Sequence, residues 1–198
     1  MGPRYTLPLT DSEGVTLEIA LILPAAVAIW GAWAYNRLIR DRNRVAAAWS
    51  DIDVQLLRRH DLVPRLVEAV RAYADYERAT MIAVTGLRAR SVTAEKLADK
   101  ARIEDEVEAG MHRLIALSEN YPDLKADDNF LQLQRDLTDI EDHLQYARRY
   151  YNGAVRIYNT RLDTVPDLLI ARPFGFSPRE FFEVPGREVR AAPTVALD

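Results

Sequence analysis

The feature that most limits how this chain can fold is an uncharged run of 17 residues, 19–35, which reads IALILPAAVAIWGAWAY. As an α-helix the run is about 25 Å long, and a few flanking residues extend it to the roughly 30 Å of a bilayer's hydrocarbon core. Its side chains are apolar on every face, whereas a helix on the surface of a soluble domain has one apolar stripe. The run therefore predicts a transmembrane helix over residues 15–36, with the membrane lipid bilayer as its partner.

The residues on either side of this run predict its orientation. Residues 1–18 carry one arginine and three acidic side chains, whereas four arginines lie between residues 37 and 44. Positively charged flanks stay in the cytoplasm, and the aromatic side chains of Trp30, Trp33 and Tyr35 suit the headgroup level beside them. We therefore expect a single-pass protein of the cell (inner) membrane, with the N-terminus outside and the C-terminal domain cytoplasmic.

Two other interpretations of the run compete with a membrane span. A cleaved signal peptide would carry a basic segment before the apolar run, and the segment here is acidic. A helix buried in a soluble core would need only one apolar stripe, and this run is apolar all round. Both alternatives explain the residues less well than a span does.

Beyond the arginines the chain has the repeats of amphipathic helices. A stripe from Ile103 to Tyr121 predicts a helix that begins near residue 93 or 94, and residues 120–123 form a connection. The start of the next helix is predicted near residues 127–129, with Gln132 in capping-box spacing, and its end near Pro166. Its narrow apolar seam alternates spacings of three and four for four heptads: Phe130, Leu133, Leu137, Ile140, Leu144, Ala147, Tyr151, Ala154 and Tyr158.

The first helical region, residues 45–87, allows two arrangements that differ in the number of helices. Apolar residues between positions 45 and 87 share one heptad register, which is interrupted at three polar positions that include Arg59. Pro64 lies within this register, and a proline inside a helix costs about 3 kcal/mol or more. A turn over residues 59–63 with Asp61 as a cap would give four antiparallel helices, whereas a kinked continuous helix would give three. The unbroken register favours the kink.

The C-terminal part predicts no further long helix. Residues 166–184 hold four phenylalanines among prolines and a glycine, a pattern too broken for an ordinary helix. This segment is either a cap that packs onto the bundle end or a membrane-surface contact through the phenylalanines with Arg172 and Arg179. Residues 185–198 are expected to be disordered, and residues 1–14 form the N-terminal tail.

Composition excludes several kinds of chemistry. The 198 residues contain no cysteine, which rules out disulfides, thiolate zinc sites and cysteine nucleophiles. With 26 Lys and Arg against 30 Asp and Glu the net charge is -4, so nothing favours nucleic acid as a partner. The sequence has no H-E-x-x-H motif, no G-x-S-x-G motif and no glycine-rich phosphate loop. We therefore expect no enzymatic activity and no cofactor.

The three histidines provide one weak candidate for metal binding. Glu108 and His112 lie four residues apart and share a helix face, but a di-iron site in a bundle needs paired Glu-x-x-His elements, which do not occur. The simpler expectation is a solvated charge pair.

The densest polar cluster is the candidate functional site. A catalytic interpretation would use Asp51 or Asp53 with His60 as acid and base, but spacings of seven to nine residues require reach over about two helical turns. Ion pairs and caps that hold a helix corner, or a face that docks a protein partner, are the two favoured interpretations. The cluster comprises Trp49, Asp51, Asp53, Gln55, Arg58, Arg59, His60, Asp61 and Pro64.

A Tyr-Asn pair occurs twice, one heptad apart, at Tyr151-Asn152 and Tyr158-Asn159. Tyrosines on a seam bury their rings while the hydroxyl finds a partner at the edge, and adjacent asparagines can fix helix register through hydrogen bonds. Ligand binding between the helices is the alternative.

Four blocks of this sequence closely resemble the LemA family in order and spacing. They are YNRLIRDRNRVAAAWSDIDVQLLRRHDLVPRLVEAVRAYADYE, YPDLKADDNFLQLQRDLTDIED, ARRYYNGAVRIYNTRLDTVPDLLIA and FGFSPREFFE, and together they extend from about residue 35 to 183. The resemblance implies a bacterial envelope protein with a single N-terminal span and a four-helix up-and-down bundle. It therefore favours the turn at Pro64, against the register, and it implies no reaction, cofactor or substrate.

The resemblance also bears on the polar cluster, because its strongest block covers those nine residues. It makes them the best candidates for fold specification or partner docking without choosing between the two.

We therefore expect an all-α protein with a membrane helix at 15–36, a bundle at 37–165 and a cap at 166–184. Its expected function is that of an adaptor or scaffold with protein partners that the sequence does not identify, and an extracytoplasmic factor for envelope maintenance or secretion is the runner-up. The oligomeric state stays open, because one seam can close within a chain or between chains.

Overall fold

The longest element, α1, is a single helix of 60 residues, Ser12–Arg71. The computed structural model describes residues 12–74 and 77–182, and it describes side chains from residue 21 onward. The predicted turn over residues 59–63 is wrong, because α1 continues through Pro64 and the chain reverses only between Arg71 and Arg78. Arg88 Nε on α2 donates to the His60 carbonyl, 3.0 Å away, which is the helix acceptor that loses its usual donor when residue 64 is proline. A side chain from a neighbouring helix thus lets α1 pass through the proline.

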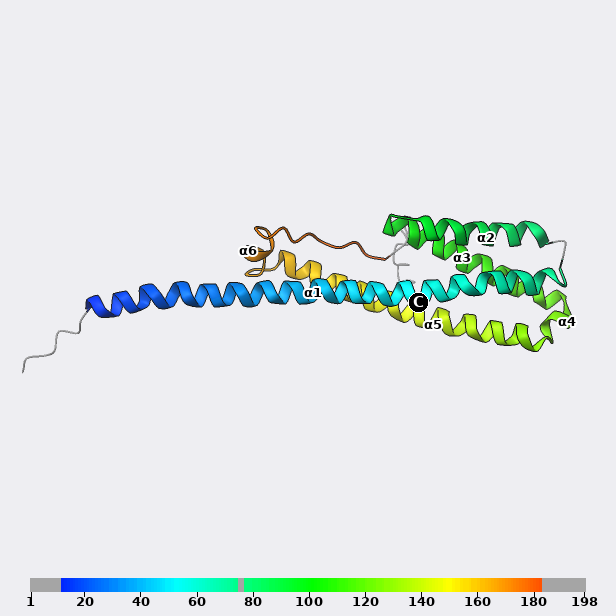
Figure 1. The fold of residues 1–198 in the computed structure, drawn as a ribbon, viewed down its shortest axis with the longest axis horizontal. Helices are drawn as coiled ribbons and strands as arrows, with labels where there is room; N and C mark the ends of the chain where they lie inside the picture. The colour runs from blue at the N-terminus through cyan, green and yellow to red at the C-terminus, as the bar shows by residue number, and fades with distance from the viewer. Residues whose placement is uncertain (1–11, 75–76, 183–198) are drawn as a thin grey trace, which may run out of the picture.

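Three further long helices follow α1 and alternate in direction along it (Figure 1). They are α2 (Arg78–Thr93), α3 (Leu97–Leu117) and α5 (Asp128–Asp163). Two short elements, the 3-10 helix η2 (Ser118–Asn120) and α4 (Pro122–Lys125), connect α3 to α5, and α6 (Leu168–Ala171) follows α5. Four long helices that alternate in direction are present as predicted, but their first connection, between Arg71 and Arg78, lies about two to four turns later than Pro64.

The predicted seam of α5 is confirmed, since all nine of its residues are buried. Asp127 is the N-cap and accepts a hydrogen bond from the Phe130 amide at 3.0 Å. The proposed capping box of Asn129 and Gln132 is wrong, because the Gln132 amide instead donates to Asp136. The helix α3 begins at Leu97, three to four residues later than predicted.

The buried apolar side chains form two clusters that divide the molecule along its length. The distal cluster joins α1 from Leu62 onward to α2, α3, α4 and the first part of α5. The proximal cluster joins residues 38–56 of α1 to residues 144–162 of α5, and the C-terminal segment, residues 172–182, closes it with Phe182. The helices α2 and α3 accompany only the distal part of α1 (Figure 1), so the C-terminal segment covers the part that they leave open.

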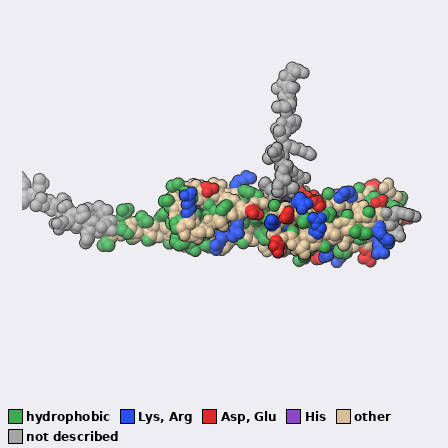
Figure 2. Space-filling model, turned by 90° about the horizontal axis from the view of Figure 1, so that it is seen from above, with side chains coloured by type: hydrophobic (Ala, Val, Ile, Leu, Met, Phe, Trp, Pro, Cys, Tyr) green, Lys and Arg blue, Asp and Glu red, His purple; other side chains and the backbone are tan. Residues whose placement is uncertain are grey.

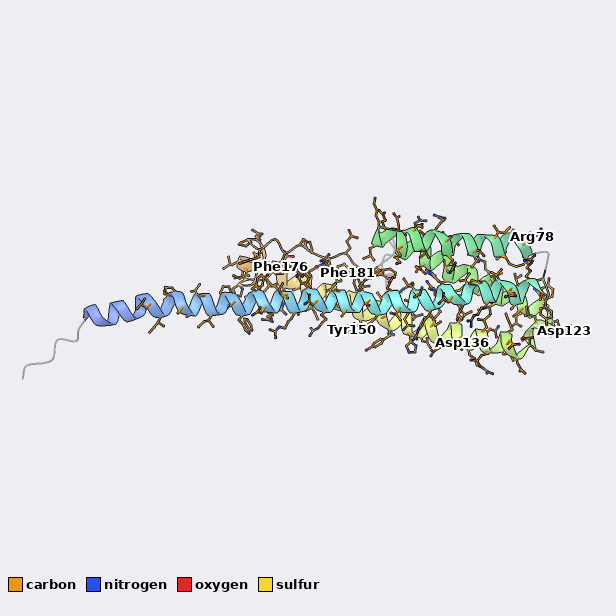
Figure 3. All side chains as sticks on the ribbon, in the orientation of Figure 1. Arg78, Asp123, Asp136, Tyr150, Phe176 and Phe181 are labelled. Atoms are coloured by element: carbon orange, nitrogen blue, oxygen red, sulfur yellow. The ribbon has the colours of Figure 1, made fainter. Side chains whose placement is uncertain are left out.

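The described residues of the predicted cap, 166–182, therefore pack along the flank of the helix pair formed by α1 and α5. Phe182 is buried and Phe176 is half-buried, whereas Phe174 and Phe181 are exposed. Figure 3 shows Phe176 and Phe181 on this segment, beside the proximal part of α1. Packing onto the bundle end, as predicted, is thus replaced by packing onto its flank.

Among the residues whose side chains the structure describes, 21–74 and 77–182, no helix combines the length and the apolarity needed to cross a membrane. The predicted span, residues 15–36, includes six positions whose side chains lie outside the description. The predicted tail 185–198, and all but the last three residues of the tail 1–14, also lie outside the described residues.

Candidate functional site

The predicted polar cluster is divided by α1 between the core and the surface. Arg59 has no exposed surface and His60 is 4% exposed, so both belong to the interior. Trp49 and Gln55 are half-buried. The other five members are exposed: Asp51, Asp53, Arg58, Asp61 and Pro64.

The buried half of the cluster binds a glutamate on α3 that sequence reasoning did not single out. Glu104 is fully buried, and its Oε2 accepts from Arg59 Nη2. Its Oε1 lies 2.8 Å from His60 Nε2 and also accepts from the Ser91 hydroxyl on α2. An ionised carboxylate can only accept hydrogen bonds, so His60 Nε2 carries the hydrogen of that pair. One carboxylate therefore links α1, α2 and α3.

Arg59 extends this network to the fourth long helix. Its Nη1 donates to Glu141 Oε1 on α5 at 2.9 Å, and its Nη2 also reaches the Glu104 carbonyl at 3.2 Å. Burial opposes the charge of the guanidinium, but the carboxylates of Glu141 and Glu104 outweigh it and raise the pKa of Arg59. Arg59 and His60 thus belong to a buried ion-pair network that contacts all four long helices, and their role in specifying the fold stays a prediction.

The charge state of Glu104 follows from the same contacts. Burial alone would raise its pKa, but the hydrogen bond from His60 and the charge of Arg59 outweigh burial and lower the pKa to about 2. Glu104 is therefore ionised at neutral pH although it has no exposed surface. Three side chains bond to its oxygens, and its burial keeps them from contact with solvent.

The second candidate pair, Glu108 and His112, does not form the solvated charge pair that was predicted. The Glu108 carboxylate lies 3.8 Å from Arg59 Nη1 and 3.9 Å from Arg148 Nη1, whereas His112 is exposed. Burial and the neighbouring Glu141 charge raise the pKa of Glu108. In the described part of the chain no three His, Asp or Glu side chains are close enough together to hold a metal ion.

The catalytic combination of Asp51 or Asp53 with His60 is not assembled either. His60 faces Glu104 in the core, while the Asp53 carboxylate pairs with Lys100 Nζ at 3.1 Å on the surface. Asp51 is exposed. The three side chains therefore stay apart, because spacings of seven and nine residues separate positions on one helix by about 10 and 13 Å along its axis.

Trp49 lies where three elements meet in the proximal half. Its ring contacts Tyr151 of α5 and Phe182 of the C-terminal segment, with both centroid distances 5.7 Å. Lys100 Nζ of α3 lies 5.5 Å from the same ring. Trp49 thus marks the boundary at which α3 ends its contact with α1 and the C-terminal segment takes over.

The two Tyr-Asn pairs hold the C-terminal segment rather than setting the register between helices. Asn152 donates to the Phe182 carbonyl at 3.2 Å and accepts from the Phe182 amide at 2.9 Å. Asn159 makes the same two bonds with Arg179, at 2.8 and 2.9 Å. Tyr151 and Tyr158 are buried, and burial raises the pKa of both phenols; the Tyr151 hydroxyl donates to the Glu180 carbonyl at 2.9 Å.

The spacing of these pairs explains why the arrangement works. Seven residues of an α-helix rise about 10.5 Å, and three residues of extended chain cover about 10 Å. Asn152 and Asn159 are seven apart on α5, while Phe182 and Arg179 are three apart on the segment. Two side-chain amides therefore act on the segment as a neighbouring β-strand would.

A further ion-pair site at the proximal end was not predicted. Arg161 on α5 donates through Nε to Asp41 on α1, and its Nη1 lies 3.3 Å from Asp167 beside α6. Both carboxylates are buried to 7% exposure. No spacing in the sequence relates residues 41, 161 and 167, so only the fold brings them together.

Two exposed members of the cluster, Arg58 and Asp61, line a hollow between α1 and α5. Arg58 and Asp61 face Asp136 and Asp139 of α5 across a cavity of about 290 Å³. Figure 3 shows Asp136 on the side of α5 that points away from α2. Two of the five exposed cluster members thus line a hollow on the surface.

These observations define an all-α protein whose helices pack around two apolar cores with a buried arginine–glutamate centre between them. The chain belongs to the LemA family, because the model of the LemA family matches residues 48–197. It is 25% identical over 131 residues to Protein LemA of Metamycoplasma hominis, which covers 65% of this chain and 59% of that protein. It is also 25% identical over 208 residues to the magnetosome proteins MamQ 1 and MamQ 2 of Paramagnetospirillum magneticum, covering 92% of this chain and 73% of each. The chain thus spans less than two thirds of the length of the LemA protein that it matches.

Proposed function

We propose that this chain is a non-enzymatic, single-pass membrane protein, anchored by residues 15–36, whose bundle acts as an adaptor or scaffold at the cytoplasmic face of the cell (inner) membrane. The observation that carries the anchoring is the first part of α1, which extends beyond the bundle with its apolar side chains uncovered (Figure 2). Leu21, Ile22, Leu23, Val27 and Ile29 are 57–72% exposed. A contiguous apolar surface of this kind is a binding surface for lipid or protein.

The burial and hydrogen bonding of the side chains around Glu104 support the proposal that the protein is not an enzyme. Arg59, His60 and Ser91 each bond to Glu104 in the interior, so these hydrogen bonds join helices to one another. A catalytic acid or base needs access to a substrate and a pKa near the working pH. Glu104, with a pKa of about 2 and no exposed surface, meets neither condition.

The orientation can be tested because the sequence has no cysteine. Single cysteines introduced by Thr10→Cys and by Val92→Cys, the latter on the exposed face of α2, would be labelled in intact cells with a membrane-impermeant maleimide. We expect labelling of Thr10→Cys in intact cells and of Val92→Cys only after lysis. The opposite result would favour the runner-up, an extracytoplasmic factor in envelope maintenance or secretion, and recovery of the protein without membranes would refute the anchor.

The adaptor role is tested at the hollow beside α5. Arg58→Ala combined with Asp61→Ala removes two exposed charges without touching the core, so we expect an unchanged melting temperature and a changed set of proteins crosslinked in membranes. The matched control Asp51→Ala removes an exposed charge outside the hollow and should leave the set unchanged. If the double variant leaves the set unchanged as well, the hollow is not the docking face.

A further inference from the structure

A hairpin between α5 and the C-terminal segment packs against residues of the proposed membrane helix itself. This proximal hairpin, residues 164–176, comprises the residues that follow α5, the short helix α6 and the turn after it. A methyl group added to Gly31 would lie 3.7 Å from Ile170 Cδ1. The Tyr35 ring lies 5.1 Å from Phe174 and 5.6 Å from Phe176, both centroid to centroid. Gly31 and Tyr35 both fall inside residues 15–36.

The hairpin is held at this level by the ion pairs of Arg161. That side chain bonds Asp41 on α1 and Asp167 at the start of α6. Two nearly buried carboxylates on one guanidinium make a strong, directional contact. Any movement of α1 into or out of a bilayer therefore carries the hairpin with it.

The outer surface of the hairpin is apolar and uncovered. Val165, Leu169 and Phe174 are 62–69% exposed, and Trp33 of α1 is 51% exposed at the same level. Arg172 is exposed on the hairpin, and Arg37 lies 5.1 Å from the Trp33 ring. Large apolar side chains beside arginines are typical of segments that lie in the headgroup region of a bilayer.

We infer that the proximal hairpin is a second membrane contact, which inserts Val165, Leu169 and Phe174 into the headgroup region of the leaflet that faces the bundle and prefers anionic lipid. This inference rests on the proposed anchoring by residues 15–36. Gly31 lies five residues before the end of that segment, which corresponds to about 7 Å along a helix. The hairpin therefore reaches the depth of roughly 5–10 Å at which interfacial segments bury their apolar faces.

The contact has a consequence for the geometry of the whole bundle. A single membrane helix leaves an attached domain free to change its distance from the bilayer when the linker is flexible. Here α1 continues into the bundle without a break, and the hairpin adds a second attachment on the flank of α1. The bundle is thereby held at a fixed height above the lipid surface.

The test uses the full chain in vesicles of phosphatidylcholine and phosphatidylglycerol at 3:1, with a fluorescent NBD label on single cysteines and with brominated lipid as quencher. Leu169→Cys reports on the hairpin, Val27→Cys on the anchor, and Ile82→Cys on α2 is the matched control. Leu169 and Ile82 are both large aliphatic residues with exposures of 62% and 65%. We expect brominated lipid to reduce the emission of the Val27 and Leu169 labels at least twofold and to leave that of Ile82 unchanged. Replacing phosphatidylglycerol by phosphatidylcholine should weaken the quenching at Leu169 more than at Val27.

The other outcomes separate the inference from the proposed function. Quenching at Val27 without quenching at Leu169 overturns the second contact and leaves the anchor intact. Absence of quenching at Val27 overturns the anchor. A Leu169 label whose emission is shifted to the blue but is not quenched by brominated lipid shows that protein, such as a second copy of this chain, covers the hairpin, which also overturns the inference.

Discussion

At the scale of single residues, the fold depends on how the buried negative charge of Glu104 is compensated. A charge without exposed surface is costly, and it is tolerated when opposite charge and hydrogen bonds satisfy it. Arg59, His60 and Ser91 do so from α1 and α2. The heptad pattern placed Arg59 at a core position as a polar exception, but its partners lie 45 and 82 residues away, beyond the reach of any periodicity.

The lowered pKa of Glu104 predicts a stability that depends on pH. Its pKa falls from 4.5 to about 2 on folding, so the folded state binds this proton less tightly than the unfolded state. At about 1.4 kcal/mol per pKa unit, the carboxylate contributes about 3 kcal/mol above pH 4.5, and the contribution is lost as the pH falls toward 2. We expect Glu104→Gln to unfold at lower urea concentration at pH 7, with the difference from the parent shrinking toward pH 3, measured by circular dichroism of the full chain in detergent.

The matched control for that measurement is Glu106→Gln on the same helix. Glu106 pairs with Arg102 at the surface, where an ion pair contributes at most about 1 kcal/mol. It should shift the unfolding midpoint little at any pH. A Glu104→Gln variant as stable as the parent at pH 7 would contradict the account of the buried centre.

At the scale of elements, α1 shows how a proline can be kept inside a helix. Register and local propensity gave opposite expectations at Pro64, and the family resemblance favoured the turn. The helix continues because Arg88 of α2 supplies a donor for the His60 carbonyl and because Val63 and Leu66 are buried on either side of the proline. Neither contribution is local, which explains why the sequence left the two alternatives open.

This account of Pro64 predicts a coupling between two positions on different helices. Arg88→Met leaves the partly buried His60 carbonyl without its donor and should destabilise the protein by about 1–3 kcal/mol. In a Pro64→Ala background, residue 64 regains its amide donor, so the same substitution should cost much less. Urea unfolding of the four proteins of this cycle measures the coupling.

Arg90→Met is the matched control for the cycle, because Arg90 is exposed on the same helix. Its cost should be small and equal in both backgrounds. If Arg88→Met costs the same with proline and with alanine at position 64, Arg88 does not compensate the proline.

At the scale of the whole molecule, the chain has two packed halves with different third partners for the α1–α5 pair. The distal half is completed by α2 and α3, and the proximal half by the C-terminal segment. The buried centre of Arg59 and Glu104 lies between Leu56 of the proximal cluster and Leu62 of the distal one. The halves should therefore respond separately when the contacts of one are removed.

Asn152→Leu combined with Asn159→Leu tests this separation. The substitutions remove four hydrogen bonds to the segment while keeping side chains of similar size, at a cost of about 1 kcal/mol for each bond. We expect faster amide hydrogen exchange in residues 176–182 and in the proximal part of α5, with α2 and α3 unchanged. Asn129→Leu, an exposed position of α5, is the control that should leave exchange of the segment unchanged. Equal acceleration in both halves would show that they unfold as one unit.

The sequence by itself determined the all-α class, the seam of α5, the presence of Arg59 in a core register and the apolar run at residues 19–35, because each is a periodic or contiguous property of neighbouring residues. Tertiary structure alone decided the partners of Arg59, the passage of α1 through Pro64 and the docking of residues 179–182 on two asparagines. Each of these joins groups from different helices, and hydrogen-bond geometry and desolvation decide such contacts only when the helices are already packed.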